Sequence, residues 1–339
     1  MSFALLASAL IPSLLLIWYF HSRDVYPEPK KVVLATFLLG VLIIIPTLIV
    51  AAPIAWLLKQ ADIGPYLYGA STAFFVAAIP EELLKFSVLF LYASRHREFD
   101  EPMDGIVYGV VASLGFATLE NVLYTATGGM TVAIARSITA VPAHAFMGAI
   151  MGYYVGQARF GAGGDGRGLM FKALFWPILL HGLYDAPLLI VARLNELAGG
   201  ISGEQTLPAL ALLPVTFVAL LTLAISGFRL TSKLRREQLA QGQSASGGAT
   251  ASGTAVAPQQ GSYAGGCALV VIGGLAASIG GLIMLGVVAG LVTGELGQEQ
   301  LSSVLLGSVI IGLMPFAVGL LLFVLGIRKL PKHERVRPG

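Results

Sequence analysis

The sequence predicts an all-α integral membrane protein, a polytopic bundle of about nine transmembrane helices with a seven-helix core and a C-terminal two-helix hairpin. Of the 339 residues, 56% are hydrophobic and 12% are charged, whereas soluble domains carry about 25% charged residues. The sequence also contains repeated apolar runs close to the ~20 residues that a helix needs to cross a bilayer. These runs cover approximately 3–20, 32–58, 66–93, 105–127, 131–157, 169–193, 207–227, 265–293 and 301–327.

The distribution of basic residues predicts the orientation of the chain. Short cytoplasmic loops carry an excess of Lys and Arg. Of the 21 Lys and Arg residues, 17 fall in loops or in the tail that the nine spans place on one side. We therefore expect a multi-pass protein of the cell membrane with its N-terminus outside and its C-terminus in the cytoplasm. The net charge of +3 and the lack of a basic block argue against a nucleic-acid partner and leave the lipid bilayer as the surrounding partner.

Composition divides the chain into four segments. We expect a seven-span core over 1–229, a flexible cytoplasmic Gly/Ser/Ala linker over 230–264, a two-span hairpin over 265–327 and a basic cytoplasmic tail over 328–339. The linker lacks any pattern that could form a core. The hairpin has no charge within its apolar runs, so packing or assembly is its expected role. The first apolar run has no basic residue before it, which favours a retained span over a cleaved signal peptide.

Six ionisable side chains fall near the middle of four consecutive predicted spans. A charge at the bilayer centre costs about 2.5–3.5 kcal/mol on insertion scales, so such residues normally face a bundle interior or a wet cavity. With alternating span directions and 1.5 Å per residue, these groups fit a slab roughly 10 Å thick. The residues are Glu81 and Glu82 in 66–93, Glu120 in 105–127, His144 in 131–157, and His181 and Asp185 in 169–193.

Helical spacing links several of these groups. His181 and Asp185 are four residues apart and share a helix face. Lys85 lies four residues after Glu81 and three after Glu82, so it can neutralise one carboxylate and leave the other free. Taken singly, a Glu–Lys pair can be structural and a mid-span His can be a packing residue. The conjunction of all these groups at one depth favours a functional pocket.

The residue types in this pocket suit the activation of water. A glutamate can act as a general base. Histidines together with a carboxylate can hold a metal, and catalytic zinc typically takes three protein ligands and a water. The chain has no HExxH helix, which excludes a zincin-type site.

Three ordered motifs give the chain a resemblance to a known family. An EExxK motif covers 81–85, an FxxxE motif covers 116–120 and an HxxxD motif covers 181–185. Two further stretches, Asp104 to Gly109 and His144 to Gly148, also look like family sequence. With these motifs the chain resembles the PrsW family of intramembrane metalloproteases, distant relatives of the CAAX prenyl proteases. The resemblance covers roughly residues 60–190.

The resemblance implies an intramembrane endopeptidase that hydrolyses membrane-embedded or membrane-proximal protein substrates, such as a single-span regulatory protein. Carried over residue by residue, it implies that Glu81 is the general base and that Glu82 and Lys85 set its charge and position. Glu120, His181 and Asp185 would then bind the water or metal and stabilise the oxyanion. We expect Zn²⁺ as the cofactor, with His144, His181 and Glu120 as its ligands; His144 enters this set from its depth. The CAAX relatives suggest a rival picture in which Glu and His act on water without a metal.

Two other functions compete with proteolysis. A proton-coupled membrane transporter would also carry acids at the membrane midplane, but inverted repeats would be expected and the sequence shows none. An inactive protease-like scaffold would keep the fold without activity, and the complete set of motifs argues against that loss.

Overall fold

A computed structural model describes residues 3–161, 165–198 and 210–247 of the chain, together with the isolated positions 322 and 325. Every regular element within these residues is a helix. The predicted hairpin over 265–327 and the tail therefore lie outside the described residues, apart from two single positions. The elements are α1 (Phe3–Arg23), α2 (Lys30–Leu42), α3 (Ile44–Gln60), α4 (Pro65–Ser71), η1 (Thr72–Ala78), α5 (Ile79–Ser87), η2 (Val88–Tyr92), η3 (Ala93–Arg95), α6 (Pro102–Ile138), α7 (Ala140–Phe160), α8 (Gly166–Ala198) and α10 (Leu213–Gly247).

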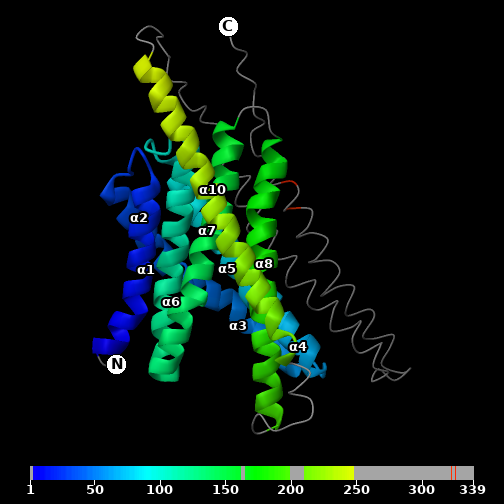
Figure 1. Cartoon of the computed structure of the whole chain (residues 1–339). Helices are drawn as coiled ribbons and strands as arrows, with labels where there is room; N and C mark the ends of the chain where they lie inside the picture. Colours follow the sequence, from blue (N-terminus) through cyan, green and yellow to red (C-terminus); the bar gives the residue numbers. More distant parts are fainter. Residues whose placement is uncertain (1–2, 162–164, 199–209, 248–321, 323–324, 326–339) are drawn as a thin grey trace.

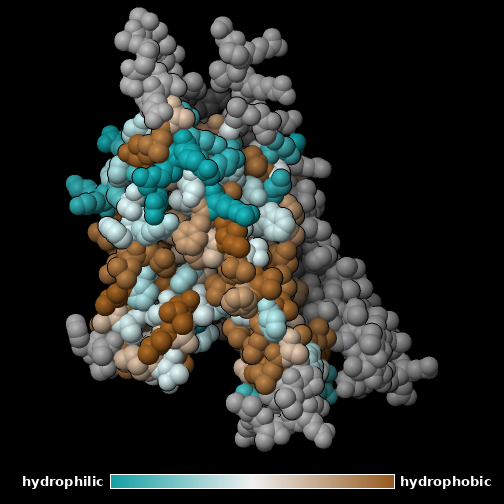
Figure 2. Space-filling view, in the orientation of Figure 1, coloured by the Kyte–Doolittle hydropathy of each residue, from teal (hydrophilic) through white to brown (hydrophobic). Residues whose placement is uncertain are grey.

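The long helices lie side by side, and the two ends of this bundle differ in polarity. The start of α1 and the end of α10 lie at opposite ends (Figure 1). Hydrophilic side chains gather at the end where α10 finishes, and apolar side chains cover most of the surface below them (Figure 2). At the hydrophilic end, Arg23 of α1 and Arg235 and Arg236 of α10 line one cavity of about 430 Å³. We call this the basic end.

Five helical stretches are long and apolar enough to cross a membrane in the described part of the chain. Large apolar side chains such as Ile49, Trp56 and Phe217 are exposed on them, as lipid-facing helices require. The structure thus bears out the all-helical membrane fold, but it does not show nine crossings. The stretches are Leu5–Arg23, Lys30–Gln60, Pro102–Phe160, Gly166–Leu197 and Leu213–Gln241.

The stretch Pro102–Phe160 is one continuous apolar segment, yet it folds back on itself. Gly129 has φ 68° and ψ −161°, a non-helical conformation inside α6, which glycine tolerates without strain. The chain reverses there, so the first part of α6 packs against α7. A side chain on Gly152 would meet the backbone carbonyl of Gly105, and one on Gly148 would meet that of Gly109. Small residues therefore let the two helix backbones touch, as in other membrane-helix contacts.

The predicted span 66–93 is not a regular helix. It is made of the short helices α4 and α5, the π-helical segments η1 and η2 and the 3₁₀ turn η3. Pro80 stands in the first turn of α5, directly after the π-helical segment η1, and it supplies no backbone N–H at this join. π-helical segments in membrane or soluble helices occur frequently at functional sites, and here they flank the segment with the two adjacent glutamates.

Helix α10 continues well past the predicted end of the core at residue 229 and into the predicted linker. Charged residues follow the apolar part of α10, but the helix continues through them. Lys233 and Glu237 form an i,i+4 pair at 4.0 Å in this part. Leu234 is buried, and Gln238 hydrogen-bonds Asp24 at 2.7 Å. Helix α10 runs to Gly247, so its last part covers residues that the sequence predicts as the start of the linker. The domain boundaries stay a prediction.

Candidate active site

Helix α5 brings two carboxylates and an ammonium into the interior of the bundle. Its sequence suits a short helix, with Pro80 and two acids in the first turn and Lys85 in the last. The segments η1 and η2 continue the helical backbone on both sides of α5, so these charged groups lie inside a longer helical stretch. Glu82 and Lys85 are completely buried, and Glu81 is nearly so. Burying these charges is tolerable only because they contact one another.

Lys85 is the centre of the cluster. Its Nζ donates to Glu81 Oε2 at 3.0 Å and to Glu82 Oε1 at 2.7 Å. The same nitrogen lies 2.9 Å from Nδ1 of His144 on α7, and it sits 4.5 Å from the centre of the Phe116 ring. Because an ammonium only donates, His144 Nδ1 accepts and the ring proton belongs on Nε2.

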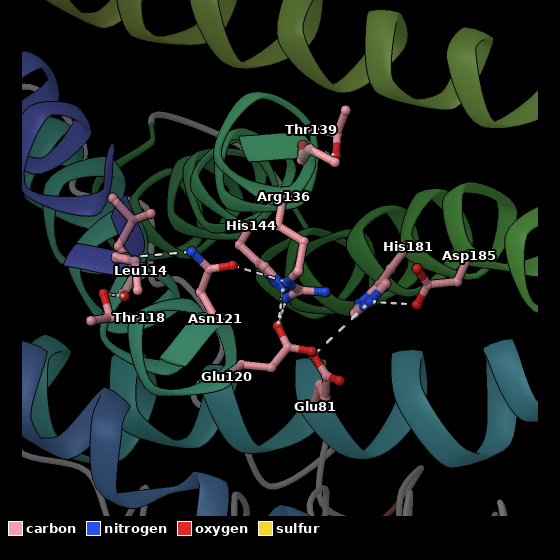
Figure 3. Close-up of polar contacts among 12 residues, drawn as sticks. Glu81, Leu114, Thr118, Glu120, Asn121, Arg136, Thr139, His144, His181 and Asp185 are labelled. Atoms are coloured by element: carbon pink, nitrogen blue, oxygen red, sulfur yellow. Dashed lines mark hydrogen bonds and ion pairs between the residues drawn. The ribbon is translucent and has the colours of Figure 1, made fainter. Parts of the chain in front are cut away.

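His144 and His181 connect α5 to the neighbouring helices. His144 Nε2 donates to Glu120 Oε2 of α6 at 3.0 Å. His181 Nδ1 lies 2.9 Å from Glu82 Oε1, and its Nε2 lies 3.1 Å from Asp185 Oδ2. Glu81 Oε2 is farther from His181, at 4.0 Å. All the candidate residues from the sequence therefore join one continuous network across α5, α6, α7 and α8, part of which Figure 3 shows.

Arg136 and Asn121 also belong to this network, although no role for Arg136 was predicted from the sequence. Arg136 Nη2 donates to Glu120 Oε2 at 2.6 Å, and its Nε donates to Asn121 Oδ1 at 3.0 Å. Its guanidinium also lies 4.1 Å from the Tyr124 ring centre. The signal was available in part, because Arg136 and Lys85 are the Lys and Arg residues that lie more than four residues inside one of the first seven predicted spans. The spans 105–127 and 131–157 predicted the reversal near Gly129, but not that the side chain of residue 136 would meet that of residue 120.

Among the described residues the network is exposed on one side. Lys85 and the Glu82 side chain have no exposed surface, whereas 22% of the Asp185 side chain and 15% of the Glu120 side chain are exposed. The Arg136 side chain is 17% exposed. Along α6 and α8 these exposed members are the ones farther from the basic end. Water or a substrate would reach the network from that side.

The donors of the network fit a metal ion in their chemistry. One ligand atom from each of Glu81, Glu82 and His144 lies within 4.8 Å of the others, and two carboxylates with an imidazole are ordinary zinc ligands. Glu82 Oε2 is buried and has no protein hydrogen-bond partner. The Lys85 ammonium contacts the same three side chains, so it must move aside before a dication can take its place.

The predicted metal ligands His144, His181 and Glu120 overlap with this set in one residue. His144 contacts Glu120 directly, as described, and the His144 and His181 rings lie edge to face with centroids 5.4 Å apart. The described residues bring these three side chains into one network but do not make them a converging ligand set. Their assignment as metal ligands stays a prediction.

Comparison with known proteins identifies relatives of this chain. A model of the PrsW family of intramembrane metalloproteases matches residues 28–222. The protease PrsW of Geobacillus kaustophilus is 41% identical over 192 residues, covering 56% of this chain and 82% of the relative. The protease PrsW of Bacillus subtilis is 39% identical over 184 residues (54% and 82%), and that of Clostridioides difficile is 33% identical over 191 residues (55% and 79%). No solved structure matches. The matched region contains the whole network.

Proposed function

Since the chain belongs to the PrsW family of intramembrane metalloproteases, a family of multi-pass membrane hydrolases, we propose that it cleaves membrane-embedded or membrane-proximal proteins with water activated by Glu81. Its substrates would be membrane proteins, for example single-span regulatory proteins. The carboxylates and imidazoles at one depth support hydrolysis inside the membrane, where water must be admitted to a protein-lined pocket.

The difference between the two adjacent glutamates carries the assignment of the base. Glu82 Oε1 is held by Lys85 at 2.7 Å and by His181 at 2.9 Å. Glu81 is held more loosely, by Lys85 at 3.0 Å and His181 at 4.0 Å, and its side chain is 9% exposed. A base needs reach to a water molecule and freedom to accept its proton. Glu81 meets both needs better than Glu82, which acts as the anchor of Lys85.

The remaining residues hold and stabilise the reacting groups. Asp185 holds His181 at Nε2 and Glu82 holds it at Nδ1, so His181 would donate toward the oxyanion, which forms as water attacks the peptide carbonyl, after one of these carboxylates releases its N–H. Glu120 orients His144 in the same way and is itself fixed by Arg136 at 2.6 Å. Such carboxylate–histidine pairs set the tautomer of the ring. Lys85 keeps the two glutamates of α5 in place and offsets their charge.

Two ligand sets could hold the family's metal, which when bound would polarise a carbonyl and acidify a water molecule. The set Glu81, Glu82 and His144 converges in the described conformation. The set His144, His181 and Glu120 leaves Glu81 free to act as the base. Zinc bound per chain, measured in Glu81→Gln and in Glu120→Gln, separates them: loss only in Glu81→Gln supports the first set, and loss only in Glu120→Gln supports the second.

We place the N-terminus outside the cell and the basic end in the cytoplasm. Support comes from the arginines that gather around the cavity at that end, as the positive-inside rule requires. In this orientation the open side of the network faces away from the cytoplasm. Substrate cleavage is then expected in the outer half of the bilayer or near its outer surface.

Cleavage in liposomes tests the proposal. The protein is reconstituted with a panel of tagged single-span membrane proteins, and cleavage is followed by the change in fragment size. Loss of a general base lowers the rate by about 10²–10⁴-fold, so Glu81→Gln should be nearly inactive. Glu196→Gln is the matched control, because Glu196 on α8 is exposed and pairs only with Arg193 among the described residues. Equal cleavage by wild type and Glu81→Gln would show that Glu81 is not the base. Proton flux without cleavage would favour the hypothesis of a proton-coupled transporter.

A further inference from the structure

A second cluster of buried carboxylates lies at the basic end, apart from the active-site network. Asp24 and Glu28 come from the loop between α1 and α2, and Asp104 comes from the first turn of α6. Their exposed fractions are 6%, 5% and 0%. One oxygen from each lies within 4.8 Å of the others. Asp104 precedes Glu120 by 16 residues on α6, about 24 Å along the helix axis, so the two clusters do not share groups.

Among the described residues no ion pair offsets these carboxylates, although the His21 imidazole lies close enough to favour the charged form of Asp24. None of the ion pairs among the described residues includes Asp24, Glu28 or Asp104. Burial raises the pKa of Asp24 and of Glu28, and the carboxylate of the neighbouring Asp100 raises both further. Buried charges are normally paired or bound to a metal. The cluster therefore requires either shared protons or a cation.

Two of the carboxylates use one oxygen for the fold and leave the other one free. Asp24 Oδ1 accepts from the Tyr26 N–H at 3.0 Å and from Gln238 Nε2 at 2.7 Å. Asp104 Oδ2 accepts from two backbone N–H groups just before α6, at 2.7 and 2.8 Å. Asp24 Oδ2 and Asp104 Oδ1 are buried and have no protein hydrogen-bond partner. Native structures rarely leave such atoms unsatisfied, and an ion is one of the standard explanations.

Glu28 is fixed in a way that suits the same purpose. Its Oε2 accepts a hydrogen bond from the hydroxyl of Tyr108, one turn further along α6, and its backbone carbonyl contacts His21 Nε2 at 3.0 Å. The loop that carries Asp24 and Glu28 is thus held against α6 by contacts that do not use the free oxygens. This leaves a preformed site with two unused carboxylate oxygens beside a third carboxylate.

We propose that Asp24, Glu28 and Asp104 bind one hard divalent cation, Mg²⁺ or Ca²⁺. Such ions take carboxylate oxygens at about 2.0–2.1 Å for Mg²⁺ and 2.3–2.6 Å for Ca²⁺. Oxygens on opposite sides of the ion are then about 4–5 Å apart, so three oxygens within 4.8 Å of one another can share one ion. Water fills the remaining coordination positions. The ion joins the α1–α2 loop to α6, and Gln238, which bonds Asp24, extends the connection to α10.

Manganese binding tests the proposal on the full-length protein in detergent. After treatment with EDTA, Mn²⁺ is titrated and the free ion is measured by electron paramagnetic resonance, with Mg²⁺ and Ca²⁺ as competitors. Asp24→Asn/Asp104→Asn keeps the oxygens that accept the structural hydrogen bonds but removes two charges. Its Kd should rise by at least ~10-fold, the size of effect that lost support at a metal site produces. Glu101→Gln is the control, since Glu101 borders the cluster and contacts Gln238 at 2.5 Å but supplies no ligand.

Glu82→Gln separates this site from the active-site network. It should keep the Mn²⁺ that the double variant loses. The proposal is wrong if the double variant binds Mn²⁺ as wild type does, or if wild type binds none that Mg²⁺ or Ca²⁺ displaces. It is also wrong if the double variant melts at a higher temperature while Mg²⁺ leaves wild type unchanged, because the carboxylates then share protons instead. Should the double variant not fold, the Mg²⁺-dependent rise in wild-type melting temperature must still be smaller in Asp24→Asn.

Discussion

The two buried acidic clusters of this protein solve the same electrostatic problem in different ways. In the active-site network every carboxylate contacts a Lys, an Arg or a His of the same chain. In the cluster at the basic end, no ion pair among the described residues includes the carboxylate of Asp24, Glu28 or Asp104, and two of their oxygens have no hydrogen-bond partner. The first cluster carries its compensating charges permanently. The second must take protons or an ion from its surroundings.

Their positions in the bundle explain the difference. The active-site network lies deep among α5, α6, α7 and α8, where an unpaired charge is costly at the membrane centre. Charged side chains of the same chain offset the carboxylates there, and they also hold the reactive groups in place. The cluster at the basic end is carried by the α1–α2 loop and the first turn of α6, and Asp24 follows Arg23, which lines the cavity at that end. An ion can reach it from water, so the positive charge that offsets its carboxylates can exchange with the solvent.

Removing Lys85 should have the largest effect, because it breaks the fixed compensation. Lys85→Met leaves Glu81 and Glu82 buried beside each other without their shared ammonium. Breaking a buried pair costs about 3–5 kcal/mol, so we expect a marked fall in the melting temperature and loss of proteolysis. Thermal unfolding in detergent and cleavage in liposomes measure both effects.

A double variant distinguishes lost charge balance from lost packing. Lys85→Met/Glu82→Gln removes one charge of each sign and should recover part of the lost stability, because contacting residues couple in mutant cycles by about 0.5–3 kcal/mol. Activity should stay lost. If Lys85→Met melts like wild type, fixed compensation is not what permits this cluster to be buried, and the contrast between the two clusters fails.

The sequence predicted the active-site network much better than the acidic cluster at the basic end. Intramembrane depth, i,i+4 spacing and three motifs were enough to bring Glu81, Lys85, Glu120, His144 and His181 together. Each of these signals is local to one span or depends on the bilayer as a common reference. The family resemblance then supplied the activity, which the comparisons confirm.

What the sequence could not predict depends on tertiary geometry. Arg136 reaches Glu120 across the reversal at Gly129; the predicted spans place that reversal, but they do not show which side chains face each other across it. Asp24 and Asp104 are 80 positions apart, and both fall near predicted loop ends, where acids are usually solvated. The helical extension of α10 that brings Gln238 to Asp24 occurs in sequence with the composition of a linker. Long-range packing, which composition does not encode, decided all three.

A substitution in the α6–α7 contact should disturb both clusters, because α6 carries Asp104 and Glu120. Gly152→Val puts a branched side chain against the Gly105 carbonyl. Overpacking of this kind costs about 1–3 kcal/mol, so we expect a lower melting temperature, slower cleavage and weaker Mn²⁺ binding together. Gly64→Ala is the control, since a Cβ at Gly64 meets nothing within 4 Å. Loss of activity with unchanged Mn²⁺ binding would show that the two clusters do not depend on one helix contact.

The pH dependence of stability should reveal the acidic cluster at the basic end. We expect this effect to be smaller than those of the substitutions above. Burial and the nearby acid Asp24 raise the pKa of Glu101 from 4.5 to about 7, and the pKa values of Asp24 and Glu28 are raised in the same direction. Between these values the folded protein binds more protons than the unfolded chain, so stability is greatest below about pH 4.5 for this contribution and falls as the pH rises through about 7.

Melting temperatures measured in EDTA across this range test the dependence. Wild type should lose stability as the pH rises from about 5 to about 8, and Glu101→Gln, which cannot ionise, should lose less. Added Mg²⁺ should restore stability at the alkaline end in both proteins, because the ion replaces the protons that the cluster has lost. An increase in wild-type stability over the same range would mean that groups with lowered pKa values dominate. A decrease that Mg²⁺ does not reverse would mean that protons alone neutralise these carboxylates. Neither acidic cluster would then bind an exchangeable metal ion.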